Sequence, residues 1–272
     1  MSSLIERLEA SAPELARRSI AEMYDNPFWQ ERFGSRGREN ADRDGQYHVS
    51  YLIQALAARD ASVLTNYARW LQTLLVSRGM SSRHIAENFD RLARAIRREV
   101  PESEPALELL AAATGALVYD VGPARELQTL APPLARVVVD ELERSHTAWF
   151  AAASSYPSLA SLESIEQAER ARFENEVLDF IAYLADALNA GRPELFVRHA
   201  LWTHAYQVRR RAPLTRVEQT LITLRDCLSA PPKDLSVAPE LAVQAALVLD
   251  TAIEGLRQPQ TSPPPSPEAN SP

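Results

Sequence analysis

Polar side chains that could bind a ligand gather in one stretch near the start of the chain. The six residues with this potential are Arg38, Arg43, Asp44, Tyr47, His48 and Tyr51. The two arginines offer planar guanidinium forks, which bind carboxylates through paired hydrogen bonds. If a helix covers about residues 38–58, the last four side chains share one face, because three- and four-residue spacings superimpose on a helix. These residues form either a small-ligand site or internal salt bridges that tie a loop to the helix.

Motifs of known enzyme classes are missing from the sequence. It contains no glycine-rich phosphate loop, no HExxH and no Gly-x-Ser-x-Gly. Lys233 is the only lysine, which leaves little room for Schiff-base chemistry, and the single Cys227 excludes an internal disulfide or a multi-cysteine metal site. We therefore expect a non-catalytic protein. An acid–base enzyme is the less favoured alternative, because its scattered Asp, Glu and His residues would leave no recognisable motif.

The charge and hydropathy of the sequence argue against two classes of partner, nucleic acids and membranes. The net charge is −7, and the arginines alternate with acids instead of forming a basic stripe, so we expect no nucleic-acid partner. No run approaches 18 apolar residues and the first residues do not form a signal peptide, so we expect a cytoplasmic protein with no membrane partner.

The amino-acid composition and the residues that cap or end helices predict the fold class. Ala, Leu, Arg and Glu dominate and only eight glycines are present, which predicts an all-α protein. We expect one helix over about 61–78, capped by Asp60 and ended by Gly79, and a next one that begins at Ser81 or Ser82. Two prolines, Pro13 and Pro132, are expected in the first turns of helices.

An internal repeat predicts the domain organisation. When the chain is shifted by 132 residues, a gapless register runs from Tyr51 over Tyr183 to Ile96 over Leu228. In this register Trp70 falls on Trp202. At a shorter offset, which aligns residues 12–17 with residues 131–136, Trp29 lies within one position of Trp149, so all four tryptophans pair between the copies and indicate core positions. We expect two helical units, 1–120 and a degenerate 121–256, followed by a disordered Pro/Ser-rich tail over 257–272.

One part of the first unit resembles a known family. Arg43 and Asp44, the Tyr/Leu-rich stretch that follows, and Asp60-Ala-Ser-Val-Leu64 are similar to the Cys-x-Arg-Asp motif and following turn of phycobiliproteins. The similarity covers about residues 41–117, and Ala41 stands where that family attaches its bilin to cysteine. The resemblance implies a globin-like packing of each unit and excludes covalent bilin attachment at this position.

The same resemblance implies a ligand. In the family the Arg and Asp hold a linear tetrapyrrole, so Arg43 and Asp44 predict noncovalent tetrapyrrole binding. A globin-like second unit could also use His199 as an axial haem ligand, although a core histidine is the alternative. His204 lies about 140° further around the helix and cannot face the same pocket.

Two functions remain in view. The first is a sensor or regulatory protein that binds a small ligand, such as a tetrapyrrole, in its first unit. The alternative is a ligand-free interaction or scaffold module. Either one predicts a homo-oligomer or a protein partner, because globin-like units often pair through their helices.

Overall fold

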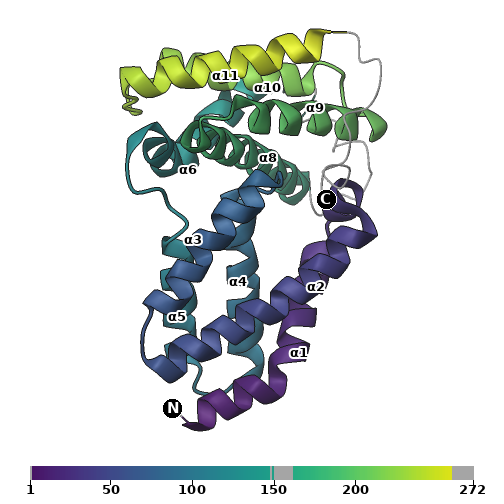
Figure 1. Ribbon diagram of the computed structural model, residues 1–272. Coiled ribbons are helices and arrows are strands. Elements are labelled where there is room, and N and C mark those ends of the chain that lie inside the picture. Colours follow the sequence, from purple (N-terminus) through teal and green to yellow (C-terminus); the bar gives the residue numbers. More distant parts are fainter. Residues whose placement is uncertain (1, 148, 150–161, 259–272) are drawn as a thin grey trace. The chain divides into compact units, whose positions relative to one another are not determined.

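The computed structural model describes residues 2–147, 149 and 162–258. Ten helices and no strand are present in these residues, which confirms the all-α prediction (Figure 1). None of the helices in this part of the chain is both long and apolar enough to cross a bilayer. The chain divides into two compact units, Met1–Val118 and a second that begins at Tyr119.

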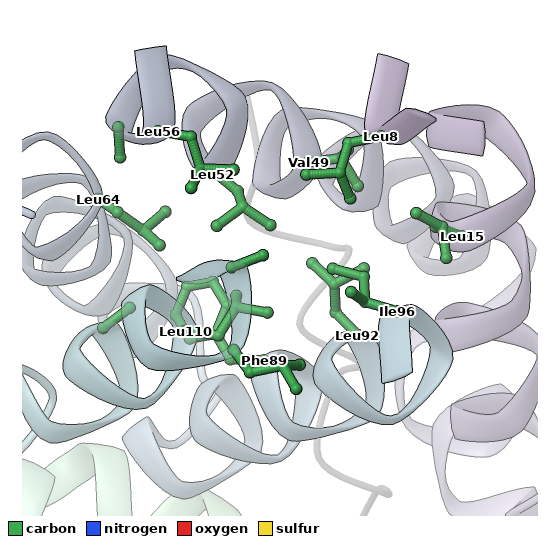
Figure 2. Packing of buried hydrophobic residues seen from close by; sticks show 14 of the residues in the cluster. Leu8, Leu15, Val49, Leu52, Leu56, Leu64, Phe89, Leu92, Ile96 and Leu110 are labelled. Carbon is green, nitrogen blue, oxygen red and sulfur yellow. The ribbon is translucent and has the colours of Figure 1, made fainter. Parts of the chain in front are cut away.

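The first unit consists of five helices. Their bounds are α1 Ser2–Tyr24, α2 Pro27–Ala58, α3 Ser62–Ser77, α4 Ser82–Glu99 and α5 Glu104–Gly115. Helix α1 packs along α2 and α4, while α5 packs against α3 and α4 and also contacts α2 (Figure 1). Apolar side chains from all five helices meet in one core (Figure 2), and those labelled there are Leu8, Leu15, Val49, Leu52, Leu56, Leu64, Phe89, Leu92, Ile96 and Leu110.

Side-chain caps explain where these helices begin. The Asn26 carboxamide oxygen accepts a 3.0 Å hydrogen bond from the amide of Phe28 at the start of α2, which also has Pro27 in its first turn. Asp60 accepts from the amide of Ser62 at 2.8 Å, and Ser81 accepts from the amide of His84. The helices predicted after Asp60 and after Ser81 are therefore confirmed.

Helix α2 is longer than the sequence suggested. It begins at Pro27 instead of about residue 38, and it passes through a kink at Gly34, whose φ is 63°. Glycine tolerates this left-handed conformation because it has no Cβ. The segment before the kink is held by aromatic packing, since the buried Trp29 ring stacks on Phe33 at 5.5 Å and meets His84 at 4.9 Å.

Five helices are also found in the described residues of the second unit. They are α6 Gly122–Ser145, α8 Leu162–Ala190, α9 Pro193–Arg209, α10 Arg216–Ser229 and α11 Pro239–Arg257. Helix α6 packs along α8 and α10, as α1 packs along α2 and α4. Helix α11 packs against α9 and α10, as α5 packs against α3 and α4.

Three expectations need correction or fall outside the described residues. Pro13 lies inside α1 and Pro132 inside α6, not in first turns. Trp70 is not a core residue, because 59 % of its surface is exposed, whereas Trp29 and Trp202 are buried. The tail expected over 257–272 falls outside the described residues from position 259 on.

Candidate functional site

A buried polar network joins three helices of the first unit. His48 on α2 is 2 % exposed, and its Nδ1 shares a 2.8 Å hydrogen bond with the hydroxyl of Tyr67 on α3. The Asn88 amide on α4 donates to His48 Nε2 at 3.3 Å. With both ring nitrogens bonded, His48 is a core histidine that ties α2 to α3 and α4.

Burial sets the protonation state of this network. It lowers the pKa of His48 to about 4, because a charged imidazolium would lose its hydration. It also raises the pKa of Tyr67, with a further contribution from the negative charge of Asp44. At neutral pH the imidazole and the phenol are therefore both uncharged.

Asp44 lies one helical turn before His48 and is half-buried. Burial raises the pKa of its carboxyl group, and the nearby positive charges of Arg43 and Arg78 lower it part of the way. Neither Asp44 nor Arg78 forms an ion pair within the described residues. Asp44 is thus a partly desolvated carboxylate with unused hydrogen-bonding capacity.

Aromatic rings cover the outer side of this network. Tyr51 stacks on Tyr67 with ring centroids 4.0 Å apart and an interplanar angle of 14°. Tyr67 in turn stacks on Trp70 at 6.0 Å and 29°. Tyr47, one turn before Tyr51, is 51 % exposed. We call Asp44, Tyr47, Tyr51 and Trp70 the aromatic surface; Tyr67, which is 6 % exposed, lies beneath it and connects Tyr51 to Trp70.

The two predicted arginines lie in different places. The Arg38 guanidinium lies 5.1 Å from the centroid of the Tyr24 ring. Arg43 donates to the side-chain oxygen of Asn40 at 2.7 Å and is near enough to Asp44 to lower the pKa of its carboxyl group. The structure therefore brings five of the six predicted site residues together in one region, with His48 beneath the surface and Arg43 at its border. Arg38 instead packs against α1.

Sequence reasoning missed three members of this region, namely Tyr67, Trp70 and Asn88. The apolar stripe of α3 predicts a core position for Tyr67, which is confirmed because Tyr67 is 6 % exposed. The repeat pairs Trp70 with a second tryptophan and also indicates a core position, which is wrong for Trp70. The spacing of Tyr67 and Trp70 by three residues was the available signal for a shared face. For Asn88 the sequence offered no signal.

In the second unit the corresponding aromatic row is buried. His199 stacks on Tyr183 at 3.6 Å and lies 5.4 Å from Phe180. Both His199 and Tyr183 are 2 % exposed, and Trp202 is 6 % exposed. His199 thus lies among aromatic rings in the core of its unit.

A second polar cluster surrounds Glu176, which corresponds to Asp44 at the shift of 132 residues and lies in the second unit. Glu176 on α8 accepts hydrogen bonds from Arg216 of α10 at 2.7 Å and from Gln207 of α9 at 3.0 Å. The Arg216 guanidinium also lies 4.3 Å from the centroid of the Phe173 ring. Burial raises the pKa of Glu176, and Arg216 and Arg172 oppose that shift. This cluster is internally paired and links three helices.

The described residues include no group of three His, Cys, Asp or Glu side chains placed to hold a metal ion. Cys227 is buried, and burial raises the pKa of its thiol to about 11, so it is a poor nucleophile. Comparison with family models, curated proteins and solved structures finds no match for this chain. The resemblance to phycobiliproteins therefore stays a prediction.

Proposed function

We propose that this protein is a non-catalytic regulatory protein that acts by binding a partner on the aromatic surface of its first unit. The observation that carries the proposal is the exposure of Trp70 and Tyr47 beside the half-buried Asp44. Tryptophan and tyrosine are the side chains most enriched at binding hot spots, since they combine a large apolar area with a polar tip.

A tandem duplication of one helical unit is part of this proposal. Within the described residues, five helices of each unit follow one another in a corresponding order, and the corresponding pairs of helices pack together. The repeat at a shift of 132 residues also places α3 on α9 and the start of α4 near the start of α10. A globin-like packing of each unit belongs to the same proposal and is supported by the sequence resemblance over about residues 41–117.

Noncovalent tetrapyrrole binding is the second candidate. It is supported by the flat, partly exposed rings of Tyr51 and Trp70, on which a planar ligand could stack, and by the exposed Arg43 and Arg78 nearby, which could bind its carboxylates. Visible spectra taken with haem, biliverdin and cobalamin test this candidate. A stoichiometric shifted band that is lost in Trp70→Ala supports it, and unchanged spectra of the free pigments count against it.

Site-specific photo-cross-linking tests the main proposal. A photoreactive phenylalanine analogue replaces Tyr47 in one variant, which keeps an aromatic ring there and leaves Trp70 in place. It replaces Val243 in a matched control, because Val243 is also exposed but lies in the second unit. After irradiation in living cells, adducts are isolated and their masses measured. A defined adduct from position 47 and none from position 243 is the expected result. Absence of any adduct at position 47 would overturn the proposal.

A further inference from the structure

We propose that the occupant of the aromatic surface is the same surface of a second copy of this chain, related by a two-fold axis. This inference rests on the proposed function and names the partner. Its support comes from the contrast between the two units and from the charges that border the surface.

The two units treat the same row of positions differently. Tyr51, Tyr67 and Trp70 correspond, at a shift of 132 residues, to Tyr183, His199 and Trp202. In the second unit this row is covered, with Trp202 only 6 % exposed, whereas Trp70 is 59 % exposed. The middle residue is buried in both units, Tyr67 at 6 % and His199 at 2 % exposed, so the contrast lies in Trp70 and the half-buried Tyr51. These two rings are therefore available to a binding partner in the first unit, whereas their counterparts in the second unit are covered.

A polar residue next to this row is also buried in the second unit and exposed in the first. Asp186, on the same face of α8 as Tyr183, is 1 % exposed and accepts a 2.6 Å hydrogen bond from the hydroxyl of Tyr119. The corresponding residue of the first unit, Gln54 on α2, is exposed. Tyr47 and Gln54, which lie two turns apart on α2, are therefore both exposed in the first unit.

The aromatic surface is bordered by one acidic and one basic side chain, so two copies of it can attract each other. Asp44 and Arg78 lie close enough for the arginine to lower the pKa of the carboxyl group, yet they form no ion pair with each other or with another described residue. In the proposed dimer Asp44 of one copy contacts Arg78 of the other, and the two-fold axis repeats this contact in the opposite direction. The same guanidinium could stack on the tyrosine and tryptophan rings, which attract cations to their faces.

A charge exchange tests this arrangement on the full chain. In Asp44→Arg the arginine faces Arg78 of its partner, and in Arg78→Asp the new carboxylate faces Asp44 of its partner, so each variant alone repels itself. In an equimolar mixture both contacts between the two variants become attractive. Trp70→Ala removes the central ring, and Val243→Ala is the matched control because Val243 is exposed in the second unit.

Molar mass measured by light scattering over a range of concentrations is the readout. We expect the wild type and Val243→Ala to rise from 30.2 kDa towards twice that mass. Trp70→Ala and each charge variant should weaken the dimer by at least about tenfold, as hot-spot truncations do. The equimolar mixture of the two charge variants should regain the dimer, and circular dichroism of each variant verifies that it is folded.

Two results overturn the inference. One is a strict monomer at every concentration. The other is a wild-type dimer that Trp70→Ala does not weaken, together with charge variants that do not regain the dimer when they are mixed. Cross-linking at position 47 separates this failure from that of the proposed function. An adduct whose mass differs from that of two chains refutes the second copy alone. Absence of any adduct refutes both.

Discussion

Replacement of His48 by phenylalanine should change how the stability of the first unit depends on pH. The wild-type imidazole is buried with a pKa of about 4, against 6.5 for an exposed histidine. Between these values the unfolded chain binds a proton and the folded chain does not, so the free energy of unfolding falls as the pH decreases. A difference of 2.5 pKa units at 1.36 kcal/mol each corresponds to about 3 kcal/mol.

In His48→Phe no imidazole is buried, so this pH-dependent loss of stability disappears, but a buried hydrogen bond is lost at every pH. Phenylalanine occupies the corresponding position, Phe180, in the second unit, so the fold should accept the ring. It leaves the buried hydroxyl of Tyr67 without its partner, which costs about 1–3 kcal/mol. The variant should therefore be less stable than the wild type at pH 7, and the difference should shrink or reverse near pH 4.

Urea unfolding followed by circular dichroism between pH 4 and 7.5 measures this difference. Tyr67→Phe is the matched control, because it breaks the same hydrogen bond but keeps the buried imidazole and with it the pH dependence. Parallel curves for the wild type and His48→Phe over the whole range would refute the assignment of His48 as a buried neutral histidine.

Three further perturbations test other parts of the structure. Arg216→Met should lower the free energy of unfolding by about 2 kcal/mol in urea titrations, since it leaves the Glu176 carboxylate without its main partner; no loss would contradict the pairing. At Gly45, where an added Cβ lies 3.3 Å from that of Ala16, we expect Ala to be nearly neutral because of its better helix propensity and Val to cost about 2 kcal/mol by overpacking α1 against α2. Thermal melts that rank the two in the opposite order would disprove that packing. Iodoacetamide at pH 8 should leave the native Cys227 thiol unmodified and should react with it in urea, because its pKa is about 11 and it is buried; rapid labelling of the native protein would show an accessible thiol.

The helical class and many helix limits could be predicted from the sequence, because capping residues act locally. Asp60, Ser81 and Gly79 mark their helix ends through contacts with residues at most four or five positions away. The first third of α2 could not be predicted in this way. Its glycines and charges are typical of a loop, and its helix depends on packing of Trp29 against His84, a residue far along the chain.

The candidate site was predicted in part for a similar reason. Helical spacing correctly grouped Asp44, Tyr47, His48 and Tyr51 on one region of α2. It could not show that His48 lies beneath the surface, since that depends on Tyr67 and Asn88 from other helices. Nor could it separate Trp70 from Trp202, because the two occupy equivalent helical positions and differ only in what covers them.

Whether the aromatic surface is occupied when the protein works can be measured directly by hydroxyl-radical footprinting with mass spectrometry. The oxidation rate of Trp70 is compared between the dilute purified protein and the protein inside living cells, and Trp202 in the core and Leu214 on the surface of the second unit serve as internal references. We predict rapid oxidation of Trp70 in dilute solution and strong protection in cells, with Trp202 slow and Leu214 unprotected in both. Equal oxidation of Trp70 in the two conditions, relative to these references, would contradict the account.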